Sequence, residues 1–134
     1  MWKALTLAAG LALAAPVAAQ DGRDGIEGVI ASQLDAFTAR DVGTAWTFAS
    51  PTIQGIFGTP ENFGRMVRGG YPMVWDNADV RFLDKTEAAG AVIQRVLIRD
   101  AEGVAHVLDY EMVETASGWV INGVRIVPAP DVGA

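Results

Sequence analysis

The chain contains no cysteine and only one histidine among its 134 residues. The absence of cysteine excludes disulfides, a thiolate nucleophile, cysteine-based zinc or iron–sulfur sites and a lipid-anchored cysteine. A single imidazole without clustered ligands gives no support to a metal site either. We therefore expect a domain that is stabilised by its hydrophobic core and uses no cofactor.

Positive charge is scarce. Ten lysines and arginines stand against 16 aspartates and glutamates, the formal net charge is −6, and the basic residues form no run. Proteins that bind phosphate backbones or anionic lipid surfaces need a concentrated basic patch. Nucleic acid is therefore not an expected partner, and neither is a membrane once a leader has been removed. Glycine-rich phosphate loops and the nucleophile elbow of serine hydrolases are also absent from the sequence.

The first segment has the features of a cleavable signal peptide. Lys3 supplies a positive charge, residues 4–15 form an apolar run rich in alanine and leucine, and residues 16–19 end in small side chains. The run is shorter than the roughly 20 residues that a membrane-spanning helix needs. We expect a signal peptide over residues 1–19, export to the periplasm or the medium, and a single mature domain over residues 20–134.

The first half of the mature chain has helical periodicity. A capping box at Asp24 and Glu27 opens an apolar stripe over residues 26–37, and a second stripe covers residues 42–49. The second helix is expected to end at Ser50-Pro51, because Pro51 disfavours helical geometry at the residue before it. A third helix is expected over residues 59–70, with a threonine N-cap followed by proline.

The second half is rich in β-branched residues and in turn residues. Short turns at Gly90, at residues 100–103 and at Ser117-Gly118 separate these segments, which is typical of an antiparallel meander. Helices that precede the strands, rather than alternating with them, favour an α+β fold. We predict three N-terminal helices packed on one bent four-stranded sheet. The expected strands are residues 80–86, 91–99, 104–115 and 119–127.

Side-chain alternation divides the last three strands into two faces. The expected register pairs Arg99 with Val104 and Ala116 with Trp119. The bulky face, expected to pack against the helices, contains Ile93, Arg95, Leu97, His106, Leu108, Tyr110, Met112, Trp119, Ile121 and Arg125. The opposite face is rich in valine and is a candidate homodimer surface. A bulge at Asn122-Gly123 would reverse the faces beyond it.

Five motifs spread over the mature chain are similar to those of a known family. They are FASPTI (48–53), FGTPENF (57–63), GYPMVW (70–75), LDYEM (108–112) and GWVING (118–123). They resemble a bacterial family known only as domain of unknown function 4864, which implies no activity and no catalytic residue. The element order also resembles the nuclear-transport-factor-2-like, cystatin-like cone, in which three helices close one end of a strongly bent sheet and leave a pocket. That fold hosts isomerases, dehydratases, binding proteins and dimerisation modules.

Two candidate general bases lie close together in the third strand. A carboxylate beside a histidine fixes its tautomer, and a carboxyl group buried among apolar residues has a raised pKa. Strand alternation, however, places His106 and Asp109 on opposite faces. We therefore interpret His106 as structural, and Asp109 with Glu111 as a polar cluster at an interface or a solvated edge. Asp109 and His106 remain the candidates for an enzyme alternative, a cofactor-free isomerase or dehydratase.

Two arginines and a tyrosine form the strongest candidate binding set. The expected register places Tyr110 opposite Arg125, with Arg95 diagonal to it, on the helix-facing side. Guanidinium groups bind carboxylate or phosphate through paired hydrogen bonds, which indicates a small anionic ligand. The alternative is internal pairing with nearby acids, namely Glu61, Asp76, Asp79 or Asp84.

The aromatic residues complete the predicted site. Tyr71 and Trp75 flank Pro72 in a connecting segment, where a pocket mouth is expected, whereas Trp46 and Trp119 are typical core residues. The main interpretation is an exported, non-catalytic domain that binds a small anionic or partly apolar ligand or serves as an accessory domain. A homodimerising interaction module is a further alternative. The predicted ligand-binding residues are Tyr71, Trp75, Arg95, Tyr110, Trp119 and Arg125.

Overall fold

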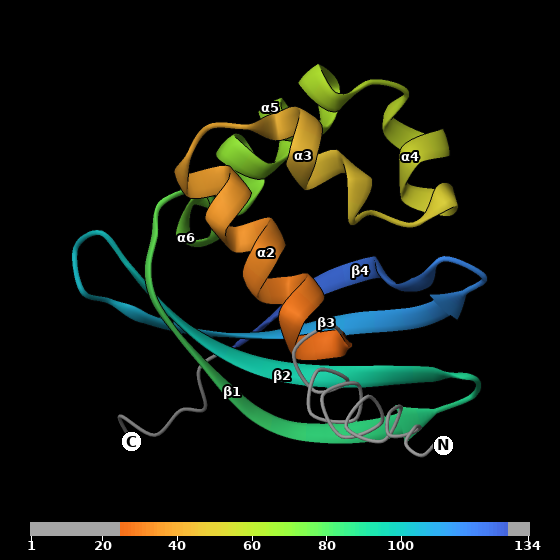
Figure 1. The fold of residues 1–134 in the computed structure, drawn as a ribbon. Coiled ribbons are helices and arrows are strands. Elements are labelled where there is room, and N and C mark those ends of the chain that lie inside the picture. The colour runs from red at the N-terminus through yellow and green to blue at the C-terminus, as the bar shows by residue number, and fades with distance from the viewer. Residues whose placement is uncertain (1–24, 129–134) are drawn as a thin grey trace, which may run out of the picture.

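A layer of helices covers one face of a single antiparallel sheet (Figure 1). The computed structural model describes residues 25–128, so the predicted signal peptide and Asp24 of the predicted capping box lie outside the described residues. The helices come first in the chain and the four strands follow in sequence order, which confirms the predicted α+β class. No helix of the described part is long and apolar enough to span a membrane.

The longest helix, α2 (Ile26–Thr38), runs across the concave face of the sheet. Its apolar stripe is buried: Ile30, Leu34 and Phe37 are almost completely inaccessible to solvent. This burial, repeated every three or four residues, is what holds α2 against the strands. The prediction of this helix from its periodicity is confirmed.

Two helices begin at side-chain caps, and the sequence predicts the second of them, at Thr59. In α3 (Val42–Thr47), the Asp41 carboxylate accepts a hydrogen bond from the Thr44 N–H at 3.1 Å. In α5 (Pro60–Gly70), the Thr59 hydroxyl accepts from the Asn62 N–H at 3.1 Å. Each cap satisfies an N–H group that has no partner inside its helix.

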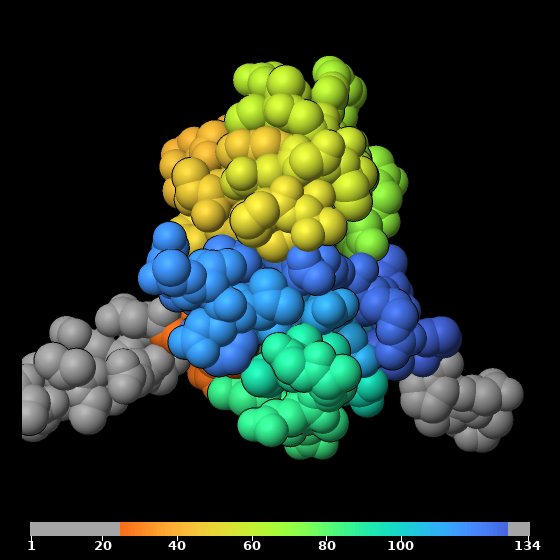
Figure 2. All heavy atoms as spheres, turned by 90° about the vertical axis from the view of Figure 1, so that its right-hand side faces the viewer, coloured from red at the N-terminus to blue at the C-terminus, as the bar shows by residue number. Residues whose placement is uncertain are grey.

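Two helices are additional to the three that the sequence predicts: α4 (Pro51–Phe57) and α6 (Pro72–Trp75). The Ser50-Pro51 pair that ends the second helix also begins α4, because the Ser50 hydroxyl accepts from the Ile53 N–H at 3.1 Å and proline suits the first helical turn. The helical layer therefore has five members among the described residues. In Figure 2, the yellow and yellow-green residues of α4 and α5 lie directly above the blue strands.

The sheet consists of β1 (Asn77–Ala88), β2 (Ala91–Asp100), β3 (Ala105–Thr115) and β4 (Gly118–Val127). All four strands coincide with the predicted segments to within three residues at each end. The sheet is strongly curved around the helices (Figure 1). Its helix-facing side carries the rest of the core, including the fully buried Val96, Ile98, Leu108 and Met112.

The register between β2 and β3 differs from the prediction by one residue. Arg99 pairs with Ala105, not with Val104, in a turn where the Asp100 carboxylate accepts from the N–H groups of Glu102 and Val104. A slip of one residue exchanges the two faces of a strand. Consequently, the predicted placement of three β2 residues on the helix-facing side is wrong: Ile93, Arg95 and Leu97 lie on the outer face.

Strand β4 contains a bulge at Asn122-Gly123, where the sequence leaves one open but the expected register has none. Glu111 pairs with Gly123 and Met112 pairs with Ile121, which leaves Asn122 as an extra residue. Beyond the bulge the alternation reverses, so that Val124 packs against the core and Arg125 lies on the outer face. The predicted position of Arg125 beside Tyr110 on the helix-facing side is therefore wrong.

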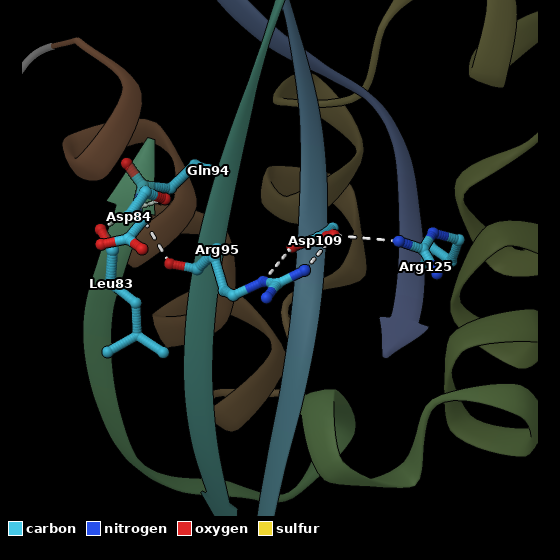
Figure 3. Close-up of polar contacts among 6 residues, drawn as sticks. All are labelled: Leu83, Asp84, Gln94, Arg95, Asp109 and Arg125. Carbon is cyan, nitrogen blue, oxygen red and sulfur yellow. Dashed lines mark hydrogen bonds and ion pairs between the residues drawn. The ribbon is translucent and has the colours of Figure 1, made fainter. Parts of the chain in front are cut away.

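A second irregularity bends β1, where Phe82 pairs with Val96 and Lys85 pairs with Gln94. The buried amide of Gln94 donates to the carbonyls of Leu83 at 3.0 Å and Asp84 at 3.4 Å (Figure 3). It also donates to its neighbour's carbonyl, that of Arg95, at 2.9 Å. These bonds take up carbonyls that the interrupted strand pairing leaves free.

Replacing Gln94 with leucine is expected to lower the free energy of unfolding by about 1–3 kcal/mol, because carbonyls in and beside the bulge lose their donor. Equilibrium urea denaturation measures the change. Gln54→Leu is the matched control, since Gln54 is only half-buried and donates to a single carbonyl, that of Trp46. Equal losses in the two variants would contradict a special role for Gln94 at the bulge.

Candidate functional site

A cavity of about 410 Å³ lies between the helical layer and the helix-facing side of β3 and β4. Four of the helices and both of these strands contribute to its wall. The lining residues are Gln33, Phe37, Ala49, Ile53, Phe57, Phe63, Met66, Val67, Tyr71, Val74, Tyr110, Ile121, Gly123 and Val124. Most of these side chains are aliphatic or aromatic, as is typical of a binding pocket for a small molecule.

The polar groups of the cavity are few and all uncharged. Gln33 donates through Nε2 to the Ala45 carbonyl at 3.1 Å. Tyr71 donates its hydroxyl proton to the Val124 carbonyl at 2.9 Å. The Tyr71 proton is therefore committed to the backbone, whereas the Gln33 amide uses only one of its two N–H groups in this way. No acidic, basic or histidine side chain of the described residues lines the cavity.

Tyr110 is the exception among the polar lining residues. It comes from the middle of β3, between Gln94 of β2 and Val124 of β4, and it has no exposed surface. Within residues 25–128 its hydroxyl has no hydrogen-bond partner. Burial, with a smaller contribution from Tyr71, raises the pKa of Tyr110 above its ordinary value. The phenol is therefore a neutral proton donor at physiological pH.

The side of the cavity beneath α4 is its least covered part. Ile53 and Phe57 come from α4, a helix that has no fully buried residue. Together with Met66 and Tyr71 they are only half-buried although they line the cavity. Their partial exposure indicates that the cavity opens beside α4.

Sequence reasoning missed two contributors to this wall. Gln33 lies on the apolar stripe of α2, between Ile30 and Phe37, and a lone polar residue on such a stripe is the signal that identifies it. The α4 residues were missed because Ser50-Pro51 was interpreted only as a helix end. A serine followed by proline also predicts a helix start.

The predicted binding residues fall into separate places. Tyr71 and Tyr110 line the cavity. Trp75 packs against Phe37 at 6.0 Å between ring centroids and lies under the Arg40 guanidinium at 4.5 Å, and Trp119 packs against the core. Neither tryptophan belongs to the cavity lining.

Arg95 and Arg125 meet on the outer face of the sheet, where both bind Asp109 (Figure 3). Arg95 donates from Nε at 2.8 Å and from a terminal nitrogen at 3.0 Å, and Arg125 donates to the second carboxylate oxygen at 3.0 Å. Asp109 retains only 10% of its side-chain exposure, whereas the arginines retain 43% and 66%. The hydrogen bond from Arg95 is the main reason that the pKa of Asp109 is lowered.

This arrangement corrects the predicted convergence of Arg95, Tyr110 and Arg125. The arginines occupy the face opposite to Tyr110, because the β2 register and the β4 bulge both differ from a simple alternation. Both arginines are instead paired with an acid of the same chain, which is the alternative interpretation. The partner is Asp109 in both cases and not one of the four acids named from the sequence.

The candidate general bases also lie away from the cavity. His106 interacts through Nε2 with the Asp100 carboxylate at 2.8 Å near the β2–β3 turn, and Asp109 is held by the two arginines. Glu111 accepts from the Asn122 amide at 3.3 Å. No group of three potential metal-ligating side chains occurs in the part of the chain that the structure describes.

The outer face of the sheet is not covered by any described helix (Figure 1). Around the ion cluster it presents half-exposed apolar side chains, including Leu97, Val107 and Val113. Such a face is suited to contact with a partner. The homodimer that the sequence predicts there stays a prediction.

Comparison with known proteins gives one match. A family model described as Domain of unknown function (DUF4864) matches residues 19–134. No curated protein matches the chain, and no solved structure matches it either.

Replacing Asp109 with asparagine is expected to destabilise the protein at pH 7, because two guanidinium groups then face a neutral amide. The pKa of Asp109 is lower in the folded state, so its stabilisation is complete above the unfolded pKa of about 3.9 and is lost as pH falls through the folded value. Urea denaturation of both proteins between pH 7 and pH 3 measures this. The difference in unfolding free energy should shrink at acid pH, and a constant difference would contradict the assignment.

Proposed function

The chain belongs to the DUF4864 family, and from the cavity of its structure we propose that it binds a small, mainly apolar molecule without catalysing a reaction. One observation carries this proposal: a cavity of about 410 Å³ is enclosed by apolar side chains, with no charged group in its lining among the described residues. Binding pockets for small molecules typically measure about 300–1,000 Å³ and combine an apolar wall with a few polar groups.

Binding is favoured over catalysis because, among residues 25–128, no acidic or histidine side chain lines the cavity. General acid–base catalysis needs such a group within hydrogen-bonding reach of the substrate. Asp109 and His106, the candidates for an isomerase or dehydratase, contact arginines and Asp100 instead. Burial raises the pKa of Tyr110, so its phenol stays protonated at neutral pH and does not accept a proton from a substrate.

Two sequence features support the same proposal. The element order resembles the nuclear-transport-factor-2-like cone, a shape that leaves a pocket between its helices and its bent sheet. The leader-like residues 1–19 support export, so the ligand would be met in the periplasm or outside the cell. An accessory protein that carries or senses an apolar molecule suits that location.

Filling the cavity is expected to weaken binding. Ile53 lines the cavity from α4, and Ile53→Trp places a larger side chain where the ligand would lie. N-phenylnaphthylamine, a neutral dye that fluoresces in apolar surroundings, is a suitable probe for titration. We expect its affinity to fall at least about tenfold, equivalent to about 1.4 kcal/mol.

Ile56→Trp is the matched control. Ile56 lies on the same helix and is 66% exposed, so the same added bulk projects away from the cavity and should leave binding unchanged. Equal losses in both variants would indicate a general disturbance of α4. Absence of dye binding to the unmodified protein would contradict the proposed function.

Export is expected to remove the first 19 residues. When the full chain is expressed in a bacterium with a periplasm, mass spectrometry of the periplasmic fraction should detect a chain that begins at Gln20. Ala19→Asp should block processing because the residue before the cut must be small, whereas Ala18→Asp, at the tolerant position next to it, should not. An intact leader on wild-type protein in the cytoplasm would contradict export.

A further inference from the structure

The unpaired hydroxyl of Tyr110 restricts what kind of molecule the cavity takes. Buried polar groups in native structures are nearly always hydrogen-bonded, and each exception requires a physical reason. Tyr110 is fully buried, lines the cavity, and has no hydrogen-bond partner for its hydroxyl within the described residues. A phenylalanine would fill nearly the same space without leaving a polar group unpaired. Burying the unpaired hydroxyl therefore lowers the stability of the fold, and packing gives no reason for a tyrosine at this position.

Among the polar side chains that line the cavity, Tyr110 is the one that makes no hydrogen bond within the described residues. Tyr71 donates to the Val124 carbonyl and Gln33 donates to the Ala45 carbonyl. The phenol of Tyr110 keeps its proton at physiological pH because burial raises its pKa. A molecule in the cavity would therefore meet an unpaired phenolic donor in a mainly apolar wall, in which the Gln33 amide is the other polar group with hydrogen-bonding capacity left.

The lining also excludes charged groups of the ligand from the interior. No lysine, arginine or histidine among the described residues is available in the cavity to pair with an anion, and no acid is available to pair with a cation. An unpaired charge taken out of water is strongly disfavoured. The arginines that the sequence suggested for an anion are bound to Asp109 on the opposite face of the sheet.

We propose that the ligand is a neutral, mainly apolar molecule with one hydrogen-bond-accepting oxygen, and that this oxygen accepts from the Tyr110 hydroxyl. This inference rests on the proposed binding function. A ketone, ester or ether oxygen on a hydrocarbon skeleton has this chemistry. The apolar part occupies the space between α4, α5 and β4. Tyr110 fixes which end of the molecule points towards the sheet.

Two probes of nearly equal shape test this inference. Acetylnaphthalene carries a ketone oxygen, and isopropenylnaphthalene carries a methylene group in its place. The affinity of each is measured by displacement of N-phenylnaphthylamine from wild type, from Tyr110→Phe and from Tyr71→Phe. The informative quantity is the ratio of ketone affinity to hydrocarbon affinity, because the apolar contribution cancels in it.

We expect this ratio to be about 2- to 10-fold higher in wild type than in Tyr110→Phe, the range that corresponds to one net hydrogen bond. Tyr71→Phe is the matched control and should keep the wild-type ratio, since the Tyr71 proton is already donated to the backbone. An equal ratio in wild type and Tyr110→Phe, with both probes bound, would overturn the inference and leave the binding function intact. Failure of both probes to bind wild type would overturn the binding function itself.

Two further measurements keep the test decisive. The thermal unfolding midpoint of ligand-free Tyr110→Phe should be equal to or above that of wild type, because an unpaired hydroxyl is removed; a lower midpoint would reveal a structural partner and overturn the inference. If the variant does not fold, infrared spectroscopy of the ketone bound to wild type decides. A carbonyl band at lower frequency than in a hydrocarbon solvent supports the hydrogen bond, and an unshifted band overturns it.

Discussion

The extra residue Asn122 determines which side chains of β4 face the cavity. Strand alternation would place Ile121 and residues 123 and 125 on one face, and the bulge breaks this sequence so that Ile121 and Val124 both contact the core. The bulge is held on both sides: the Ser50 hydroxyl donates to the Asn122 side-chain oxygen at 2.7 Å, and the Asn122 amide donates to Glu111. The start of α4 is tied to the sheet by this side-chain contact and by backbone hydrogen bonds from Ser50 to Ile121 and from Ile121 to Phe48, so the wall of the cavity and the path of β4 are coupled.

The separation of charge from the cavity follows from this constraint. With Arg125 on the outer face, both arginines reach the Asp109 carboxylate while keeping much of their own hydration. Had the alternation continued unbroken, a guanidinium group would face the helices, where no described lining residue offers a carboxylate. Desolvating an unpaired charge costs several kcal/mol. The outer ion cluster and the uncharged cavity therefore depend on the β4 bulge together with the register between β2 and β3.

Local patterns in the sequence were sufficient for the elements and insufficient for their pairing. The stripe of α2, the Thr59 cap and the four strands follow from periodicity and turn residues. The β2 register does not, because it depends on how the Asp100 side chain folds the turn onto the N–H groups of Glu102 and Val104. That one-residue difference moved Arg95 away from the predicted site, whereas Tyr71 and Tyr110 reached the cavity as aromatic residues near its wall.

The interior polar groups show how the fold combines stability with a binding space. Gln94 donates to a carbonyl in the β1 bulge, and Gln33 and Tyr71 each donate to a backbone carbonyl elsewhere. Each such hydrogen bond contributes about 0.5–1.5 kcal/mol to stability. Tyr110, at the centre of the same sheet face, serves no carbonyl of the described chain. Sites of function are where a protein departs from full satisfaction of its polar groups. The one hydroxyl in the cavity wall that does not stabilise the fold is therefore the group best placed to recognise a molecule within it.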